Sequence, residues 1–283
     1  FTGRPVLACQ SVDTAVHPDF RGQRIFEKTA GDCYAWCAES GLQAVVGFPN
    51  ASSYPGFVRN LGWKRIVFPT YWVMRLSLAG AVNRVLRLPL AGAVVDFFHR
   101  ALVSAKLAAR DTLLRRLVGP DLAFATERSC PESYEKFWNA WRAQEYLSLW
   151  KDAKYFQWRY DANPDHDFTY FTLSRRGDLA AVAVGVEIDR ALVLCELMVG
   201  GRDVNAGRLL ANRVCAHALS KGLRAVTFLG HDSGVFRDVL DAFESSTSYT
   251  NVFGGRAFVE GPLAEALPHA DNWTVTFGDG DFV

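Results

Sequence analysis

Residue types near the start of the chain favour first a strand, and a four-residue spacing of apolar and small positions then favours a helix. Val6 to Val16 is rich in β-branched and small residues, which favours a strand, and His17-Pro18-Asp19 ends it because proline cannot extend a ladder. Apolar and small side chains then recur every four positions, which predicts the buried face of a helix running to about Glu39. These residues are Ile25, Thr29, Cys33 and Cys37. Gly41 ends the helix, and residues 42–48 form a short apolar strand.

The same order of elements returns later in the chain, around a short internal repeat. Gly41-Leu42-Gln43-Ala44-Val45 recurs as Gly222-Leu223-Arg224-Ala225-Val226, and in both places it follows a helix and starts a strand. The repeat aligns a strand at 192–199 and a helix at about 205–220 with the first strand and helix. Ahead of this second copy the pattern predicts a helical run at 132–150, an aromatic stretch at 154–160 and strands at 168–173 and 180–188. The chain therefore reads as two similar halves.

A basic segment with helical periodicity separates these halves. Residues 75–118 hold eight Arg or Lys residues and only two acids, Asp96 and Asp111, and Pro89 is expected to split the segment into two helices. One interpretation is a face that binds a membrane surface or a polyanion, because Leu, Val and Phe alternate with the arginines. The other, which we favour, is an amphipathic connecting helix with a solvated basic side.

Composition limits the classes of protein that fit. The chain has 283 residues, enough for two domains, and its formal net charge of +1 gives no reason to expect DNA as a partner. It shows neither a secretory signal nor a transmembrane segment, and its six cysteines form no disulfide framework, so we expect a cytoplasmic protein. Cys33 and Cys37 have the spacing of a metal-ligand pair on a helix, but without a second pair nearby we expect packing and no metal.

The turn between the first strand and the first helix is basic. Arg21, Arg24 and Lys28 surround the start of the helix, where the macrodipole favours acids. Cations at this position are unfavourable unless an anion lies between them. The turn therefore predicts either a phosphate-binding site or an ordinary solvated loop.

The segment from this turn to Trp63 resembles the acyl-CoA-binding core of the GNAT (GCN5-related N-acetyltransferase) superfamily. The family's signature of Arg or Gln, two residues, Gly, one residue, then Gly or Ala matches Arg21-Gly22-Gln23-Arg24-Ile25-Phe26, with Arg24 and Phe26 in place of the two small residues. The resemblance implies that the coenzyme A pyrophosphate is bound by Arg21, Gly22, Gln23, Arg24 and Ile25, and that Phe26 points away from it. The stretch from Asn50, which opens a helix, to Gly62-Trp63 resembles the family's second motif, with Asn50 part of the cofactor site.

The resemblance also implies candidates for the chemistry of acyl transfer from a thioester to an amine, which needs a base for the amine, a donor to the thioester carbonyl and an acid for the thiolate. In such families the backbone amide of the strand before the turn, here Ala15 or Val16, polarises the carbonyl. Asp13 is the only acid on that strand and is the candidate base, although a structural hydrogen bond or salt bridge explains it equally well. His17 is an alternative base. The family's acid position is Val58 here, so Tyr54, one turn earlier, is the nearest candidate acid.

Together these observations predict an α/β (α+β) protein with two GNAT-like mixed-sheet domains joined by a basic helical segment. The expected divisions are 1–74 for a partial acyl-CoA-binding domain, 75–127 for the helical linker and 128–283 for the second domain. The matching turn of the second domain places Asp203 where a pyrophosphate would approach, so we expect that domain to support acceptor binding instead. The first domain starts almost at its phosphate turn, which predicts an incomplete sheet that a homo-oligomer or a partner strand could complete.

The expected function is N-acylation of an amine, on a small metabolite or amino sugar, with acetyl-CoA or another acyl-CoA as co-substrate and no metal. Two alternatives stay open. One is aminoacyl transfer from charged tRNA, as in the Fem-type double GNAT proteins, with the basic segment on the RNA. The other is a degenerate binding module without catalysis.

Overall fold

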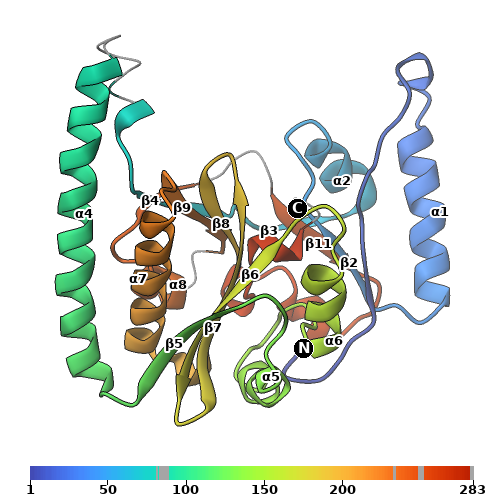
Figure 1. Cartoon of the computed structure of the whole chain (residues 1–283). Helices are drawn as coiled ribbons and strands as arrows, with labels where there is room; N and C mark the ends of the chain where they lie inside the picture. The colour runs from blue at the N-terminus through green and yellow to red at the C-terminus, as the bar shows by residue number, and fades with distance from the viewer. Residues whose placement is uncertain (81, 83–88, 232–233, 248–251, 281–283) are drawn as a thin grey trace.

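The structure, a computed structural model, describes residues 1–80, 82, 89–231, 234–247 and 252–280. It contains two mixed sheets, one of four strands and one of seven, with helices packed around them (Figure 1). The fold class predicted from the sequence is confirmed.

The smaller sheet has the strand order β1-β2-β11-β3. Its strands are β1 (Ala8–Gln10), β2 (Ala44–Gly47), β11 (Phe253–Ala257) and β3 (Lys64–Val67). β1 is parallel to β2, and β11 is antiparallel to both of its neighbours. Helices α1 (Ile25–Glu39) and α2 (Tyr54–Leu61) join these strands. A small core centred on buried Trp63 holds the helices on the sheet, with Trp63 Nε1 donating to Tyr34 Oη at 3.2 Å.

The larger sheet has the order β10-β4-β9-β8-β7-β6-β5. Its strands are β10 (Glu244–Thr247), β4 (Thr70–Arg75), β9 (Ala225–Gly230), β8 (Ala191–Val199), β7 (Asp178–Ile188), β6 (Phe168–Arg175) and β5 (Leu122–Glu127). One core packs the sheet against α4 (Pro89–Val118), α7 (Val204–Ser220) and α8 (Gly234–Val239). A separate aromatic core packs it against α5 (Tyr134–Arg142) and α6 (Ala153–Phe156). The short helix α9 (Pro262–Ala266) packs beside β11.

The two sheets exchange strands. β4 follows β3 in the chain but lies between β10 and β9, whereas β11 lies between β2 and β3 of the smaller sheet. Glycines permit this insertion, because a Cβ on Gly255 would lie 2.5 Å from the Val45 carbonyl oxygen. The exchange differs from the divisions expected from the sequence. Most of β4 was expected in the first domain (1–74) but belongs to the larger sheet, and β11 was expected in the second domain (128–283) but belongs to the smaller sheet.

The structure confirms the helix at Ile25–Glu39 but corrects which of its sides is buried. Tyr34 and Cys37 are buried, whereas Ile25, Thr29 and Cys33 are exposed. The exposed three line an open groove between α1 and the chain around β1, so no described segment covers them. The strand expected at 6–16 is regular only over Ala8–Gln10.

The connecting segment is also corrected. Its last part, Leu122–Glu127, is strand β5 of the larger sheet and not helix. α4 begins at Pro89, as expected for a break there, but residues 81 and 83–88 of the preceding part lie outside the described residues. Within the described ranges, no helix combines the length and apolarity that a membrane span requires.

Candidate functional site

The smaller sheet opens into a cavity where β1 and β2 part. The two strands pair from Ala8 to Gln10, and Ser11 N still donates to Val46 O at 2.9 Å. Beyond this point the strands diverge and leave a cavity of about 540 Å³. Its wall is formed by residues 11–15 on one side and Phe48, Pro49, Asn50, Ser53 and Phe57 on the other.

The chain along one wall of this cavity has unused backbone donors. Among the described residues, no hydrogen bond uses the N–H groups of Val12 through Val16. Asp13 has a left-handed backbone (φ 49°), which breaks the strand geometry and stops this segment from continuing the ladder. A bound molecule with carbonyl or amide oxygens would find several free donors here.

The structure brings three of the predicted site residues together. Asp13, Ala15 and Asn50 all line the cavity. Asn50 Oδ1 accepts from the N–H groups of Ser52 and Ser53, both at 3.0 Å, so its side chain also fixes the turn that begins α2. Val16 lies on the adjoining groove together with Ile25. Tyr54 is the first residue of α2 and is not part of the cavity wall.

The basic turn lies at the start of α1 and is fully exposed. Gly22 (φ 79°) and Arg24 (φ 59°) both have left-handed backbones, and no described side chain caps the helix at Arg24. Arg24 Nε pairs with Glu27 Oε2 at 2.9 Å, and Arg21 Nε donates to the Val16 carbonyl at 3.3 Å. The helix thus presents unpaired N–H groups beside two arginines, which suits an anion.

Phe26 does not obstruct this turn. Its ring packs edge-to-face on the ring of Phe57 in α2, with the two ring centroids 5.0 Å apart. A Cβ on Gly56 would lie 3.0 Å from Phe26 Cε1. The side chain thus points to α2, as the resemblance implied.

The equivalent place in the larger sheet is filled. β8 and β9 pair in parallel as far as Leu194 and Phe228, and then diverge. Residues near the end of the chain occupy the gap: His231 N donates to Val275 O at 2.8 Å, and Gly230 forms a bridge with Thr276. The short turn Phe277–Asp279 then packs against β8.

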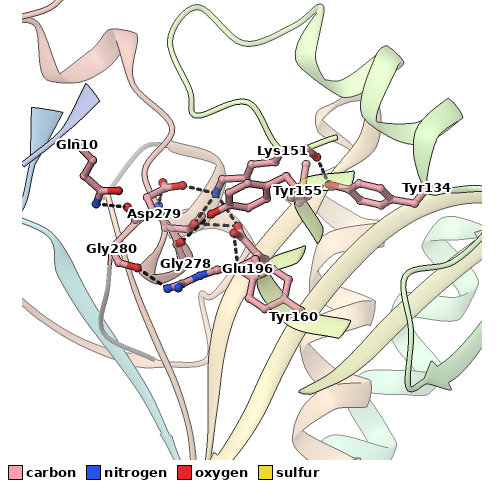
Figure 2. Close-up of polar contacts among 12 residues, drawn as sticks. Gln10, Tyr134, Lys151, Tyr155, Tyr160, Glu196, Gly278, Asp279 and Gly280 are labelled. Atoms are coloured by element: carbon pink, nitrogen blue, oxygen red, sulfur yellow. Dashed lines mark hydrogen bonds and ion pairs between the residues drawn. The ribbon is translucent and has the colours of Figure 1, made fainter. Parts of the chain in front are cut away.

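A buried ionic cluster holds this C-terminal segment in place (Figure 2). Lys151 Nζ lies 2.5 Å from Asp279 Oδ1 and 2.8 Å from Glu196 Oε2, and all three side chains are at most 2% exposed. The Tyr160 hydroxyl donates to Glu196 Oε1, and the Thr276 hydroxyl donates to Oε2, both at 2.8 Å.

The cluster shifts the pKa values of its members. The two carboxylates raise the pKa of Lys151 above its ordinary value of 10.5, in spite of the burial that opposes the charged form. Burial in turn raises the pKa of Glu196, and the neighbouring Asp279 carboxylate adds to the shift. Gly278 is essential to the fit, because a Cβ there would collide with Tyr160 Oη and Glu196 Oε1.

Sequence reasoning missed this cluster. Two signals could have found it: Glu196 interrupts the apolar strand at 192–199, and Lys151 lies inside an aromatic-rich stretch. A charged residue in an apolar run indicates a buried partner. The third member, Asp279, follows all of the predicted elements and carries no local signal.

The turn before α7 differs from its counterpart in the first half. Asp203 caps α7, accepting from Ala206 N at 3.1 Å, so this helix start already has an anionic cap. Beside it lies a cavity of about 410 Å³ whose wall combines aromatic rings with carboxylates. The wall includes Trp141, Trp273, Phe236, Glu145, Asp238 and Asp271, together with Arg202 and His231. Within the described part of the chain, no group of three or more His, Cys, Asp or Glu side chains is arranged to hold a metal ion.

Comparison with solved structures identifies the architecture. A GCN5-related N-acetyltransferase from Kribbella flavida matches 91% of this chain at 15% identity with a TM-score of 0.54. A second, from Anabaena variabilis, matches 91% at 7% identity with a TM-score of 0.57. A tandem GNAT protein from the clavulanic acid biosynthesis pathway matches 91% at 11% identity with a TM-score of 0.50. The chain has a tandem GNAT fold.

The GNAT likeness rests on structure alone. No protein-family model matches the sequence, and no curated protein matches it either. The chain spans 54% and 57% of the length of the first two solved structures and 77% of the third. At such low identities the likeness establishes the fold, while the chemistry must be argued from the residues of this chain.

Proposed function

We propose that this protein is an acyl-CoA-dependent N-acyltransferase that binds its acyl donor in the first-half cavity and transfers the acyl group to an amine of a small molecule. One contrast between the halves carries this proposal. The gap between β1 and β2 is open and lined by unused amides, whereas the gap between β8 and β9 is filled by the chain's own residues 275–279. Among the residues that the structure describes, only the first half therefore has room for a donor between its diverging strands.

The residues around the open cavity suit the parts of an acyl-CoA. The uncapped start of α1, with Arg21 and Arg24, suits the pyrophosphate, because N–H dipoles and guanidinium groups both favour an anion. The free amides at Ala15 and Val16 suit the thioester carbonyl, whose oxygen gains negative charge during transfer.

Proton transfer is assigned to one residue on the wall of this cavity and one residue next to it. Asp13 lies on its wall and is the candidate base for the acceptor's ammonium group. Tyr54, at the start of α2 next to the wall residue Ser53, is the candidate acid for the leaving thiolate.

Thermal stability in the presence of acetyl-CoA tests the donor site. A ligand that binds the folded state at about one hundred times its Kd adds about 2.7 kcal/mol of stability, which a melting curve resolves. We expect acetyl-CoA to raise the Tm of the wild type, and an Arg21→Glu/Arg24→Glu variant to lose most of this shift. An Arg175→Glu/Arg176→Glu variant, which makes the same charge change in the β6–β7 turn, serves as the control and should keep it.

Two results would contradict the proposal. Equal shifts in the wild type and the Arg21→Glu/Arg24→Glu variant would remove the turn from the donor site. The absence of a shift in the wild type would favour a non-catalytic binding module.

A further inference from the structure

Helix α4 is apolar on two sides, and the residues that the structure describes cover only one of them. Val103, Leu107 and Leu114 are buried in the core that α4 shares with α7. Another set of large apolar side chains on the same helix is exposed to solvent: Val94, Val95, Phe97, Phe98, Leu102, Leu113 and Leu117. Phe97 and Phe98 are 70% and 66% exposed. Large apolar residues that are exposed next to one another differ from the single exposed residues that are normal on protein surfaces.

Most of these exposed residues form one continuous stripe. Val94, Phe98, Leu102, Ala105, Ala109, Leu113 and Leu117 are exposed and follow one another at intervals of three or four positions, so they share one side of the helix. At 1.5 Å per residue the stripe is about 35 Å long. Figure 1 shows α4 as an outer helix beside α7, at the edge of the molecule. We call this set the α4 stripe.

The charges beside the α4 stripe are positive. Lys106 lies one turn after Leu102, and Arg116 lies three residues after Leu113; both are exposed, and neither forms an ion pair with another described residue. The two acids of α4 are engaged elsewhere. Asp96 accepts from the N–H groups of Leu78 and Ala79, and Asp111 pairs with Arg115 and with Arg213 of α7.

The neighbouring strands do not reverse this charge. A groove of about 620 Å³ separates α4 from β4 and β10, and its apolar wall reaches the stripe at Leu113. Its acid Glu244 is paired with Arg75, and the nearby Asp241 is paired with Arg110 and Arg208. The free cations Lys106 and Arg116 therefore determine the sign of the charge beside the stripe.

We propose that the α4 stripe docks this protein on an anionic lipid surface. Phenylalanine and leucine side chains enter the boundary between headgroups and acyl chains, and flanking lysine and arginine residues pair with lipid phosphates. Such docking is peripheral and needs no membrane-spanning helix. It does not depend on the acyl-transfer proposal.

A second copy of the chain fits the stripe less well. In a two-fold antiparallel pairing of α4 helices centred on the stripe, the two copies of Lys106 would meet near the axis, because position 106 is close to its midpoint. Like charges at that point oppose association, whereas an anionic surface complements them.

Vesicle co-sedimentation of the full chain tests this proposal. We expect binding to vesicles in which about a third of the lipid is phosphatidylglycerol and much weaker binding to pure phosphatidylcholine. A Phe97→Ser/Phe98→Ser variant should bind the anionic vesicles roughly tenfold more weakly or worse, because it removes the most exposed apolar area. A Lys106→Glu/Arg116→Glu variant should lose the preference for anionic lipid. Trp158→Ser, which removes an aromatic side chain of similar exposure far along the sequence from α4, is the matched control and should bind like the wild type.

Three results would overturn the proposal. The first is wild-type protein that remains in the supernatant with both kinds of vesicle. The second is undiminished binding by both double variants, which would place the lipid contact elsewhere. The third is concentration-dependent dimerisation in sedimentation velocity that Phe97→Ser/Phe98→Ser abolishes while vesicle binding is unchanged, since a second copy would then cover the stripe.

Discussion

Replacing Lys151 with methionine removes the only cation that the structure places against Glu196 and Asp279 within the described residues. Methionine has a similar length and fills the space, so the substitution changes charge more than packing. It leaves two buried carboxylates without a counter-charge, and breaking a buried ion pair in this way costs about 3–5 kcal/mol. For a chain of this size we expect a drop in Tm of roughly 6–20 °C.

The matched control is Lys136→Met. Lys136 also forms an ion pair with an aspartate, Lys136 Nζ to Asp178 Oδ1 at 2.6 Å, but both side chains are largely exposed. Exposed pairs contribute about 0–1 kcal/mol, so this variant should melt close to the wild type. Both variants can be compared by circular dichroism or differential scanning calorimetry at pH 7.5.

Acidification should reduce the deficit of Lys151→Met. Without the ammonium group, burial and the neighbouring Asp279 carboxylate both hold the pKa of Glu196 above its value in the unfolded chain, so this carboxyl group binds a proton more readily when the chain is folded. The penalty is therefore complete above the raised pKa of Glu196 and diminishes as the pH falls through it. A Lys151→Met variant as stable as Lys136→Met, or a deficit that is the same at pH 5 and pH 7.5, would refute this reasoning.

Further predictions concern the pH range, the core and the catalytic site. Because the pKa of Lys151 is raised above 10.5, its contribution is complete below that pH and is lost as the pH rises further toward the folded-state pKa, so the alkaline decline in Tm should be steeper for the wild type than for Lys151→Met. Tyr34→Phe leaves the buried Trp63 N–H without its acceptor and should cost about 1–3 kcal/mol in urea unfolding, whereas unchanged stability would show that this hydrogen bond contributes nothing. Gly255→Ala should destabilise by about 1–3 kcal/mol, because its Cβ meets the Val45 carbonyl oxygen, and a neutral effect would mean that β11 shifts freely. Asp13→Asn should lower kcat for acyl transfer about 10²–10⁴-fold and keep the acetyl-CoA shift in Tm, whereas full activity would exclude Asp13 as the base.

The sequence predicted the elements that local patterns control. Helix α1 has the predicted bounds, and the internal repeat correctly placed β8, α7 and β9. The prediction of which side of α1 is buried was wrong for Ile25, Thr29 and Cys33, because these residues face an open groove. A periodic pattern does not reveal whether another segment covers the apolar side of a helix. The 75–127 prediction was wrong at 122–127 because it extended the helical pattern past Gly119-Pro120 into strand β5.

Contacts between distant residues were beyond sequence reasoning. The insertion of β11 between β2 and β3 joins residues from opposite ends of the chain, and the only local trace is the Gly254-Gly255 pair. The candidate site shows the same contrast between what local residues predict and what distant residues determine. The resemblance to the GNAT family assigned Asp13, Ala15 and Asn50 to one site, whereas the filling of the second gap depends on residues 275–279, which match no motif.

The exchange of β4 and β11 constrains how the chain can fold while it is being synthesised. Val45 and Arg256 are register partners, so the smaller sheet acquires the strand between β2 and β3 only after residues 253–257 have left the ribosome, long after the strands on either side of it. Until then β2 and β3 lack the strand that lies between them, and the nascent first half exposes two unpaired strand edges. The proposed donor cavity, although formed by residues 11–57, therefore becomes part of a finished sheet only after residues 253–257 have been synthesised. Two separately expressed halves, cut within the connecting segment, should consequently recover their structure only when they are mixed.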